Sequence, residues 1–227
     1  QIGDVVEIQR AGDVIPQVLR VIKKNKQKNK TIKFPKKCPV CGGDTFKEKD
    51  EAVLRCINTY GCYAQKISQI THFIGKKAFN IDGFGEKQVK QFFDLKLVKN
   101  VFDIFLLKEQ KKIIEKLEGW GKLSVANLIN SIEKAKTINL DKFIYALGIR
   151  FIGEINAEIL AKELKTIENF ISTSQNTLVL SNIDGLGPKA ISSINNYFSY
   201  DQNISLIKNL SKILNIKNNK ISNSKNF

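Results

Sequence analysis

One pattern of glycine and apolar residues recurs four times along the second half of this 227-residue chain. In each copy a shared glycine has apolar residues four and one positions before it, and four and seven positions after it. The shared glycines, at successive distances of 36, 32 and 34 residues, are Gly85, Gly121, Gly153 and Gly187. A repeat of this period is typical of stacked copies of one supersecondary unit.

The repeated unit is predicted to be a glycine turn that opens into a helix. Positions four and seven after the glycine lie on one helix face. Three copies carry a second glycine two residues earlier, at Gly83, Gly119 and Gly185. Such a turn presents backbone N–H groups at the positive end of a helix, which is a phosphate-binding arrangement. The alternative is that the glycines only end helices, but four copies with matching flanks favour phosphate binding.

Charged residues distinguish the copies. Lys87, Lys122 and Lys189 stand in the first turn of the expected helices, where a cation opposes the helix dipole and so indicates a nearby anion. In the third copy Phe151 replaces the turn glycine and Glu154 takes the first helical turn. We therefore expect the third copy to be the weakest phosphate site and mainly a structural spacer.

Each copy also has an apolar residue immediately before the shared glycine. These residues either fill the gap between two helices or project toward a nucleic-acid groove. They are apolar without being uniformly aromatic, which favours burial in the core. The four residues are Phe84, Trp120, Ile152 and Leu186.

The charge of the chain favours a polyanionic partner. It contains 37 Lys and Arg residues against 22 Asp and Glu, for a net charge of +15, and such an excess attracts nucleic acid. Part of the excess reflects a general abundance of lysine along the sequence. Since no run of about 18 apolar residues is present, nucleic acid is favoured over a membrane. Contacts through backbone amides read no bases, so the expected binding is non-specific, on the minor-groove side and salt-dependent.

All four cysteines lie close together in the sequence. Two residues separate Cys38 from Cys41, and five separate Cys56 from Cys62. Two short-spaced pairs bring four thiolates together, which is the ligand set of a structural Zn²⁺ site with no open coordination position. Disulfide bonds and a redox pair are the alternatives, and the clustering in a basic chain of cytosolic character disfavours them. His72, in a helical stretch, is interpreted as an ordinary helix residue.

Four segments follow one another along the chain. Residues 1–30 are predicted to form two strands, which are not an independent domain and so belong to a larger β-structure. Residues 31–66 hold the cysteines, residues 67–214 are predicted to be helical, and residues 215–227 form a polar linker or disordered tail. Lysines are dense between residues 23 and 37, where a solvated surface and a role near phosphates both remain open.

The order of these parts resembles the C-terminal portion of bacterial NAD-dependent DNA ligases. The resemblance rests on the Cys-x2-Cys-x14-Cys-x5-Cys spacing, on the preceding segment Arg-Ala-Gly-Asp-Val-Ile-Pro, and on the four glycine turns, which correspond to helix-hairpin-helix motifs. It implies a mainly α chain. Residues 1–30 would be the end of an OB fold, residues 31–66 a four-cysteine zinc finger, and residues 67–214 the helix-hairpin-helix domain. The tail falls where the family continues into a BRCT domain.

The resemblance implies a role in sealing single-strand nicks in duplex DNA during replication and repair. The family uses NAD and Mg²⁺ to transfer an adenylyl group to the lysine of a Lys-x-Asp-Gly motif and then to the 5′-phosphate of the nick. The two similar segments here, residues 80–83 and 182–185, carry asparagine in place of that lysine. We therefore expect no catalytic residue in this chain and no ligation by it alone. The resemblance also implies a monomer in the bacterial cytosol, associated with the nucleoid.

A second interpretation is a non-catalytic zinc and helix-hairpin-helix DNA-binding module of a repair nuclease or topoisomerase. A nuclease needs clustered carboxylates for metal ions, whereas the acidic residues here are scattered among lysines. The zinc ligands expected are the four cysteines. The residues expected to contact DNA are Arg10, Gly83, Gly85, Lys87, Gly119, Gly121, Lys122, Gly185, Gly187 and Lys189.

Overall fold

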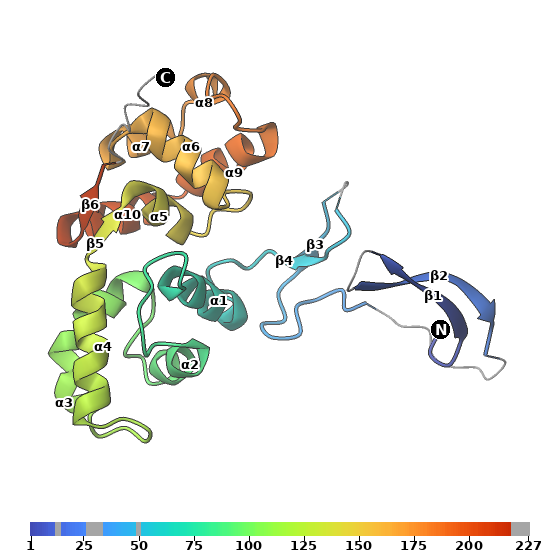
Figure 1. The fold of residues 1–227 in the computed structure, drawn as a ribbon, viewed down its shortest axis with the longest axis horizontal. Coiled ribbons are helices and arrows are strands. Elements are labelled where there is room, and N and C mark those ends of the chain that lie inside the picture. The colour runs from blue at the N-terminus through green and yellow to red at the C-terminus, as the bar shows by residue number, and fades with distance from the viewer. Residues whose placement is uncertain (12–14, 26–33, 49–50, 219–227) are drawn as a thin grey trace, which may run out of the picture. The chain divides into compact units, whose positions relative to one another are not determined.

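The computed structural model describes residues 1–11, 15–25, 34–48 and 51–218. The chain divides into two compact units, Gln1–Asn58 and Thr59–Phe227. Strands are found in both units, and the long helices all lie in the second one (Figure 1). The predicted mainly α class is therefore confirmed.

The first unit begins with a two-stranded antiparallel ribbon. Strand β1 (Val5–Ala11) pairs with β2 (Ile15–Lys23), with Val5 opposite Lys23 at one end. The expected loop residues 12–14 lie outside the described residues. Apolar side chains of the ribbon are exposed to solvent, as an isolated pair of strands would leave them. They are Val5, Ile8, Ile15, Val18, Leu19, Val21 and Ile22.

A second, shorter ribbon follows in the same unit. Strand β3 (Thr45–Phe46) pairs antiparallel with β4 (Arg55–Cys56), and Thr45 lies opposite Cys56. This pairing places the third cysteine of the sequence beside the segment that carries the first two.

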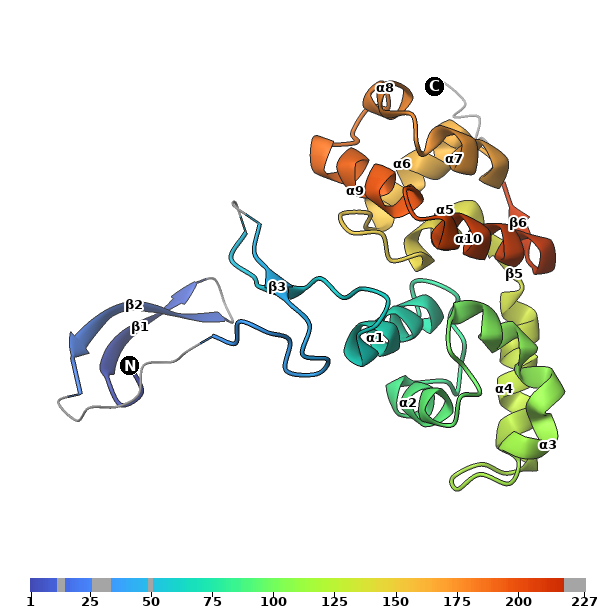
Figure 2. The ribbon, with the colours of Figure 1, turned by 180° about the vertical axis from the view of Figure 1, so that it is seen from behind.

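The second unit is a stack of short helices. Helices α1 to α4 gather on one side of this unit and α5 to α10 on the other (Figures 1 and 2). The elements are α1 (Tyr63–Ile74), α2 (Glu86–Asp94), the 3-10 helix η1 (Val101–Gln110), α3 (Lys111–Ile114), α4 (Lys122–Ala135), β5 (Thr137–Asn139), α5 (Leu140–Ala146), α6 (Glu154–Leu164), α7 (Ile167–Thr173), α8 (Thr177–Ser181), α9 (Pro188–Phe198), α10 (Asp201–Ile213) and β6 (Asn215–Lys217).

The repeated apolar columns form the core of this stack. Residues four and seven positions after each shared glycine are all buried, since those positions face inward from the new helix. The residue before the glycine is buried as expected in three copies, and Trp120 is partly buried. The indole N–H of Trp120 donates a hydrogen bond to Gln91 (2.8 Å), and its ring packs 5.1 Å from that of Phe92. The buried column residues are Val89, Phe92, Val125, Leu128, Ala157, Leu160, Ile191 and Ile194.

The C-terminal boundary differs from the expectation that a polar tail starts at residue 215. Strand β6 pairs in parallel with β5, and the Asn215 N–H donates to the carbonyl of Lys136 (2.8 Å). Ile138 is buried, and Ile216 packs against the core. Residues 67–214 are therefore not helical throughout, since β5 lies among them. The sequence did not predict β5 or β6, because each strand is only three residues long and gives no periodic signal. Residues 219–227 of the expected tail lie outside the described residues.

The N-terminal boundary of the helices also differs slightly. Helix α1 begins at Tyr63, directly after the last cysteine, rather than at residue 67. Its inward face carries Ile67, Ile70 and Phe73, which are buried as their spacing predicts. In the part of the chain that the structure describes, every helix is too short or too polar to cross a membrane.

Truncating a ring at the centre of this core tests the packing. Phe92 is fully buried, and its ring lies 5.3 Å from that of Phe84 and 5.1 Å from that of Trp120. We expect Phe92→Ala to lower the free energy of unfolding by about 3 to 5 kcal/mol, because it leaves a cavity. Urea denaturation followed by circular dichroism measures the change.

Leu95 at the end of the same helix provides the matched control. It is 49% exposed, so Leu95→Ala should change the free energy of unfolding by no more than about 0.5 kcal/mol. Equal effects of the two substitutions would contradict the packing described here.

Candidate metal centre and nucleic-acid interface

The four cysteines are positioned by three local structures. The Cys38 N–H donates to the carbonyl of Gly43 (2.8 Å) and the Gly42 N–H to the carbonyl of Cys38 (2.9 Å), which closes a tight turn around Cys41. Gly42 has φ +68°, a conformation that favours glycine. Cys56 ends strand β4, and Cys62 is the residue before α1.

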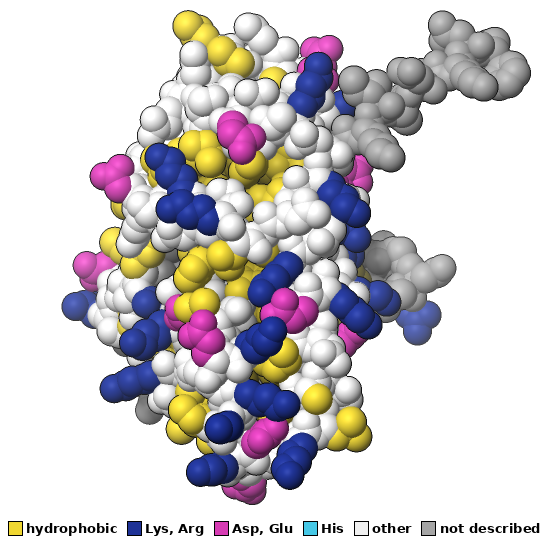
Figure 3. Space-filling model, turned by 90° about the vertical axis from the view of Figure 1, so that its left-hand side faces the viewer, with side chains coloured by type: hydrophobic (Ala, Val, Ile, Leu, Met, Phe, Trp, Pro, Cys, Tyr) yellow, Lys and Arg dark blue, Asp and Glu magenta, His cyan; other side chains and the backbone are white. Residues whose placement is uncertain are grey.

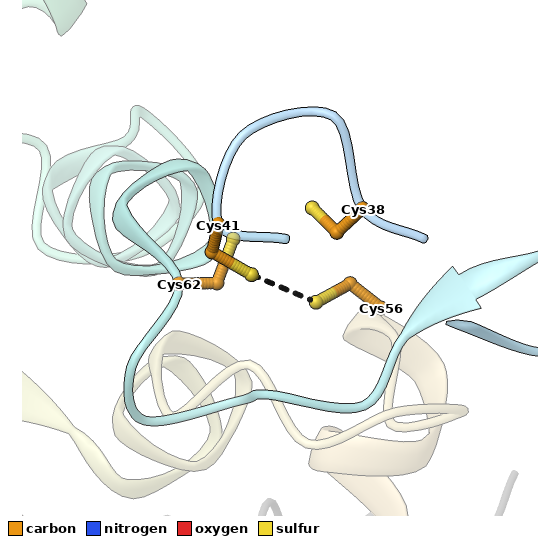
Figure 4. Close-up of side chains that lie close together, drawn as sticks. All are labelled: Cys38, Cys41, Cys56 and Cys62. Carbon is orange, nitrogen blue, oxygen red and sulfur yellow. Dashed lines mark hydrogen bonds between the residues drawn. The ribbon is translucent and has the colours of Figure 1, made fainter. Parts of the chain in front are cut away.

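The four sulfur atoms gather around one point (Figure 4). They all lie within 4.8 Å of one another, and the sulfurs of Cys41 and Cys56 are 3.6 Å apart. Four thiolates at about 2.3 Å from a tetrahedral Zn²⁺ are separated by about 3.8 Å, so the cluster has the dimensions of such a site. His72 is not part of this group: its Nε2 lies 2.8 Å from the carbonyl oxygen of Tyr145.

The chemistry of the donor set also fits a cation. Backbone N–H groups of Cys41 and Val40 donate to the Cys38 sulfur and lower the pKa of that thiol to about 7. Loss of solvent and the neighbouring thiols of Cys41 and Cys38 raise the pKa of Cys56 to about 11. Several adjacent thiolates repel one another, and a divalent cation at their centre removes that cost.

The glycine turns form four hairpins with one backbone geometry. We name them hairpin 1 (residues 81–85), hairpin 2 (117–121), hairpin 3 (149–153) and hairpin 4 (183–187). The residue two positions before the shared glycine, here called the turn position, has positive φ in every hairpin. The values are 76° at Gly83, 81° at Gly119, 62° at Phe151 and 84° at Gly185. In hairpins 2 to 4 the residue after it donates to the carbonyl three residues back, at 3.0 to 3.2 Å.

Each shared glycine caps the helix that follows. All four have extended backbone, and no side chain caps α2, α6 or α9. In hairpin 2 the hydroxyl of Ser124 accepts from the Gly121 N–H (2.8 Å). A side chain added at Gly121, Gly153 or Gly187 would meet no other atom within 4 Å. The N-termini of α4, α6 and α9 are therefore bare enough for a ligand to approach the backbone closely. At Gly85 the side-chain oxygen of Gln88 would lie 3.3 Å from an added Cβ.

The lysines expected beside the hairpins are placed accordingly. Lys87, Lys122 and Lys189 are exposed in the first turns of α2, α4 and α9. None of the three forms an ion pair with another described residue. In hairpin 3, Glu154 is paired instead with Lys77 at 2.5 Å. Arg10 is exposed on β1 of the other unit, opposite Pro16.

Surface charge alone does not mark the interface. Lysine and arginine side chains are spread over much of the face shown in Figure 3, with acidic side chains among them. Of the dense basic stretch, Lys23, Lys24, Lys36 and Lys37 are exposed, and its other lysines lie outside the described residues. The repeated hairpins therefore define the candidate interface better than net charge does.

Several apolar side chains at the hairpins are exposed, which the sequence did not predict. Leu123 and Ile155 are 75% and 74% exposed at the second helical position of α4 and α6. Phe151 is 39% exposed at the turn position of hairpin 3. The available signal was the repeat itself, because each of these residues occupies a column where another copy has lysine or glycine.

Two models of known protein families match segments of the chain. A family model described as NAD-dependent DNA ligase C4 zinc finger domain matches residues 37–64, and one described as helix-hairpin-helix motif matches residues 142–207. The first match and the geometry of the cysteine cluster together confirm the predicted structural zinc. The predicted helix-hairpin-helix character is confirmed by the second.

Curated relatives are similar over nearly the whole chain. The DNA ligase of Pelagibacter ubique (strain HTCC1062) is 50% identical, in a match that covers 96% of this chain and 33% of the relative. The DNA ligases of Rickettsia bellii (strain OSU 85-389) and Wolbachia pipientis wMel are each 42% identical, covering 97% and 94% of this chain and 34% and 33% of the relatives. The chain thus spans about a third of their length, and the expected resemblance to NAD-dependent DNA ligases is confirmed.

Replacing one cysteine tests the metal centre. We expect the purified chain to contain one zinc per molecule and Cys41→Ser to lose most of it, because three thiolates hold Zn²⁺ much more weakly than four. Metal content is measured by plasma emission spectrometry. Val40, 54% exposed between the first two cysteines, provides the control, since Val40→Ala should retain full zinc. Undiminished zinc in Cys41→Ser would exclude this site.

Two glycines of hairpin 2 test whether a positive φ alone makes a side chain unfavourable, since both have free space around them. Gly119 has φ +81° and Gly121 has φ −139°, and no atom would contact an added Cβ at either residue. We expect Gly119→Ala to lower the free energy of unfolding by about 1 to 2 kcal/mol, and Gly121→Ala to leave it within about 0.5 kcal/mol. Thermal and urea unfolding measure both. A larger loss for Gly121→Ala would contradict this turn geometry.

Proposed function

We propose that this chain is the DNA-binding C-terminal portion of an NAD-dependent DNA ligase, an enzyme that seals single-strand nicks in duplex DNA. Two features together support this most strongly. A four-cysteine cluster lies in the segment that matches the zinc finger model of such ligases, and four hairpins follow it in the chain. Helix-hairpin-helix motifs alone would favour DNA binding of many kinds. The zinc finger match narrows the proposal to one family of enzymes.

The hairpins would hold the sugar-phosphate backbone. In each one the positive-φ turn leads into a helix whose first N–H groups have no partner within the helix, and these groups and the helix dipole favour a phosphate oxygen. The expected DNA contacts are those of hairpins 1, 2 and 4, through Gly83, Gly85, Gly119, Gly121, Gly185 and Gly187. Lys87, Lys122 and Lys189 would add cationic contacts to neighbouring phosphates. None of these contacts reaches the bases, so the binding would be independent of the DNA sequence.

The partner would be duplex DNA with a nick, bound by a single copy of the chain. Strands β1 and β2 would belong to the OB fold, whose other strands would cover the apolar side chains that the ribbon exposes. Arg10 on β1 would face the duplex near the nick. We infer that the protein acts on chromosomal DNA in the bacterial cytosol, as expected for DNA ligases of bacteria.

The zinc would be structural. The four residues that would hold it are Cys38, Cys41, Cys56 and Cys62, which together provide a complete tetrahedral ligand set. NAD and Mg²⁺ would be bound by other parts of the enzyme, since this chain has no Lys-x-Asp-Gly segment. We accordingly infer that this chain binds DNA without ligating it.

The alternative is a DNA-binding module of a repair nuclease or topoisomerase. The identity of 42% to 50% to DNA ligases over almost the whole chain favours the ligase. Sequencing the coding DNA on the N-terminal side separates the two proposals. An adenylation domain with a Lys-x-Asp-Gly motif is expected there, and an uninterrupted nuclease or topoisomerase domain in its place would overturn the ligase assignment.

Two shared glycines test the hairpin contacts directly. An added methyl group at Gly121 or Gly187 has free space within the protein, but it would stand between the helix N-terminus and a phosphate. We expect the double variant Gly121→Ala/Gly187→Ala to bind a labelled nicked duplex at least about tenfold more weakly, because charge-assisted hydrogen bonds are lost. Fluorescence anisotropy measures the dissociation constant.

Salt and a substitution outside the hairpins control that measurement. Raising the salt from 50 to 200 mM should weaken binding of the unchanged chain by more than about tenfold, as phosphate contacts require. Ser205→Ala, on the exposed side of α10, should bind as the unchanged chain does. Equal binding by the double variant, or a flat response to salt, would contradict the proposed contacts.

A further inference from the structure

The turn of hairpin 3 contains a residue type that is unfavourable for its backbone conformation. Its turn position has the same left-handed backbone as the other three hairpins, but it holds Phe151 (φ 62°) where they hold glycine. Bulky side chains are strained in this region of φ. The turn is nonetheless closed by the Ile152 N–H donating to Ile149 (3.0 Å), and the side-chain amide of Asn156 donates to the Phe151 carbonyl (2.7 Å).

Burial in the core does not compensate for this strain. The Phe151 side chain is 39% exposed, whereas many phenylalanines of the second unit are fully buried. Three other non-glycine residues have positive φ among the described residues: Asn80, Lys96 and Lys165. Asparagine tolerates this conformation, and the two lysines follow helix ends, where it is common. Phe151 is therefore the strained aromatic residue that neither the core nor a helix end accounts for.

Two cations, one from hairpin 3 and one from the helix that follows hairpin 4, lie against the Phe151 ring. The Arg150 guanidinium carbon is 4.6 Å from the ring centroid, and the Lys189 ammonium of α9 is 5.9 Å from it. Hairpin 4 also lies close to α6 in the same region. A Cβ added at Gly185 would stand 3.0 Å from the Ile159 side chain. The ring thus sits where hairpins 3 and 4 meet.

This surface combines an exposed aromatic ring with two cations that lie over it. Ile155, in the first turn of α6, is 74% exposed and adds apolar surface to hairpin 3. The acidic Glu154 is already paired with Lys77, so it does not offset the two cations. A duplex minor groove has the complementary character, with apolar deoxyribose walls between two rows of phosphates.

We infer that Phe151 is a minor-groove wedge. Its ring enters the groove of the bound duplex and packs against deoxyribose and the base edges, while Arg150 and Lys189 contact the phosphates on either side. Apolar side chains inserted in this way are a recurring means of holding and deforming DNA. Hairpin 3 then contributes an apolar contact in place of the phosphate contact that its sequence weakens. This inference rests on the proposed function of the chain.

Replacing Phe151 with glycine tests the wedge, because glycine suits the turn. Phe151→Gly removes the ring and relieves the strained backbone, so its melting temperature should equal or exceed that of the unchanged chain. We expect its affinity for a nicked duplex to fall about tenfold, in the range that base–aromatic contacts contribute. The slope of the logarithm of the binding constant against the logarithm of salt concentration should stay the same, since the ring carries no charge.

Two further variants assign the effect to the ring. Phe151→Tyr keeps the aromatic surface and should bind within about twofold of the unchanged chain. Leu178→Ala removes a 78%-exposed apolar side chain from α8, outside the residues of every hairpin, and should bind as the unchanged chain does.

The outcomes separate the wedge from the proposed function. If the unchanged chain binds duplex DNA and Phe151→Gly binds equally well, the wedge is wrong and this surface serves a protein contact instead. A lower melting temperature together with a shallower salt slope in Phe151→Gly would make the residue structural, which also overturns the wedge. Failure of the unchanged chain to bind duplex DNA would remove the proposed function itself.

Discussion

A single backbone conformation, positive φ at one residue, organises the second unit of this chain. It occurs two residues before each shared glycine, at Gly83, Gly119, Phe151 and Gly185. The sharp turn it permits packs the apolar residue on each side of the turn into the core or against it, and it starts the next helix immediately afterwards. The same turn leaves the first N–H groups of that helix directed to solvent. Core packing and a candidate phosphate site are thus two consequences of one local constraint.

The zinc finger uses a related arrangement on a smaller scale. Gly42 also has positive φ, and the turn around it directs N–H groups of Val40 and Cys41 at the sulfur of Cys38. In the finger the anion is a thiolate, and in the hairpins we propose that it is a phosphate. Backbone N–H groups suit both, since they provide positive charge without a titrating side chain.

The sequence predicted the parts of this structure that depend on local spacing. Cysteine spacing predicted the four-sulfur cluster, and the apolar columns predicted the buried faces of α2, α4, α6 and α9. Strands β5 and β6 could not be predicted, because each is three residues long and its partner is remote in the sequence. The candidate interface was only partly predictable, since lysine is spread over the surface and the hairpin glycines, rather than net charge, define the candidate contacts.

The role we infer for Phe151 could not be predicted from the sequence pattern. A phenylalanine in a glycine column predicts a lost site when the sequence is considered alone. Its positive φ, its exposure and its contacts with Arg150 and Lys189 become evident only when hairpins 3 and 4 are brought together. Phenylalanine at this position then indicates an apolar contact with DNA in place of a phosphate contact.

The central claim is that the amides at the helix N-termini hold the DNA backbone. Titrating ¹⁵N-labelled protein with a nicked duplex while recording amide chemical shifts tests it most directly. The account predicts that the largest shift changes fall on the amides of residues 85–88, 121–124, 187 and 189–190. Changes confined to the β1–β2 ribbon, with these helix N-termini unaffected, would contradict it.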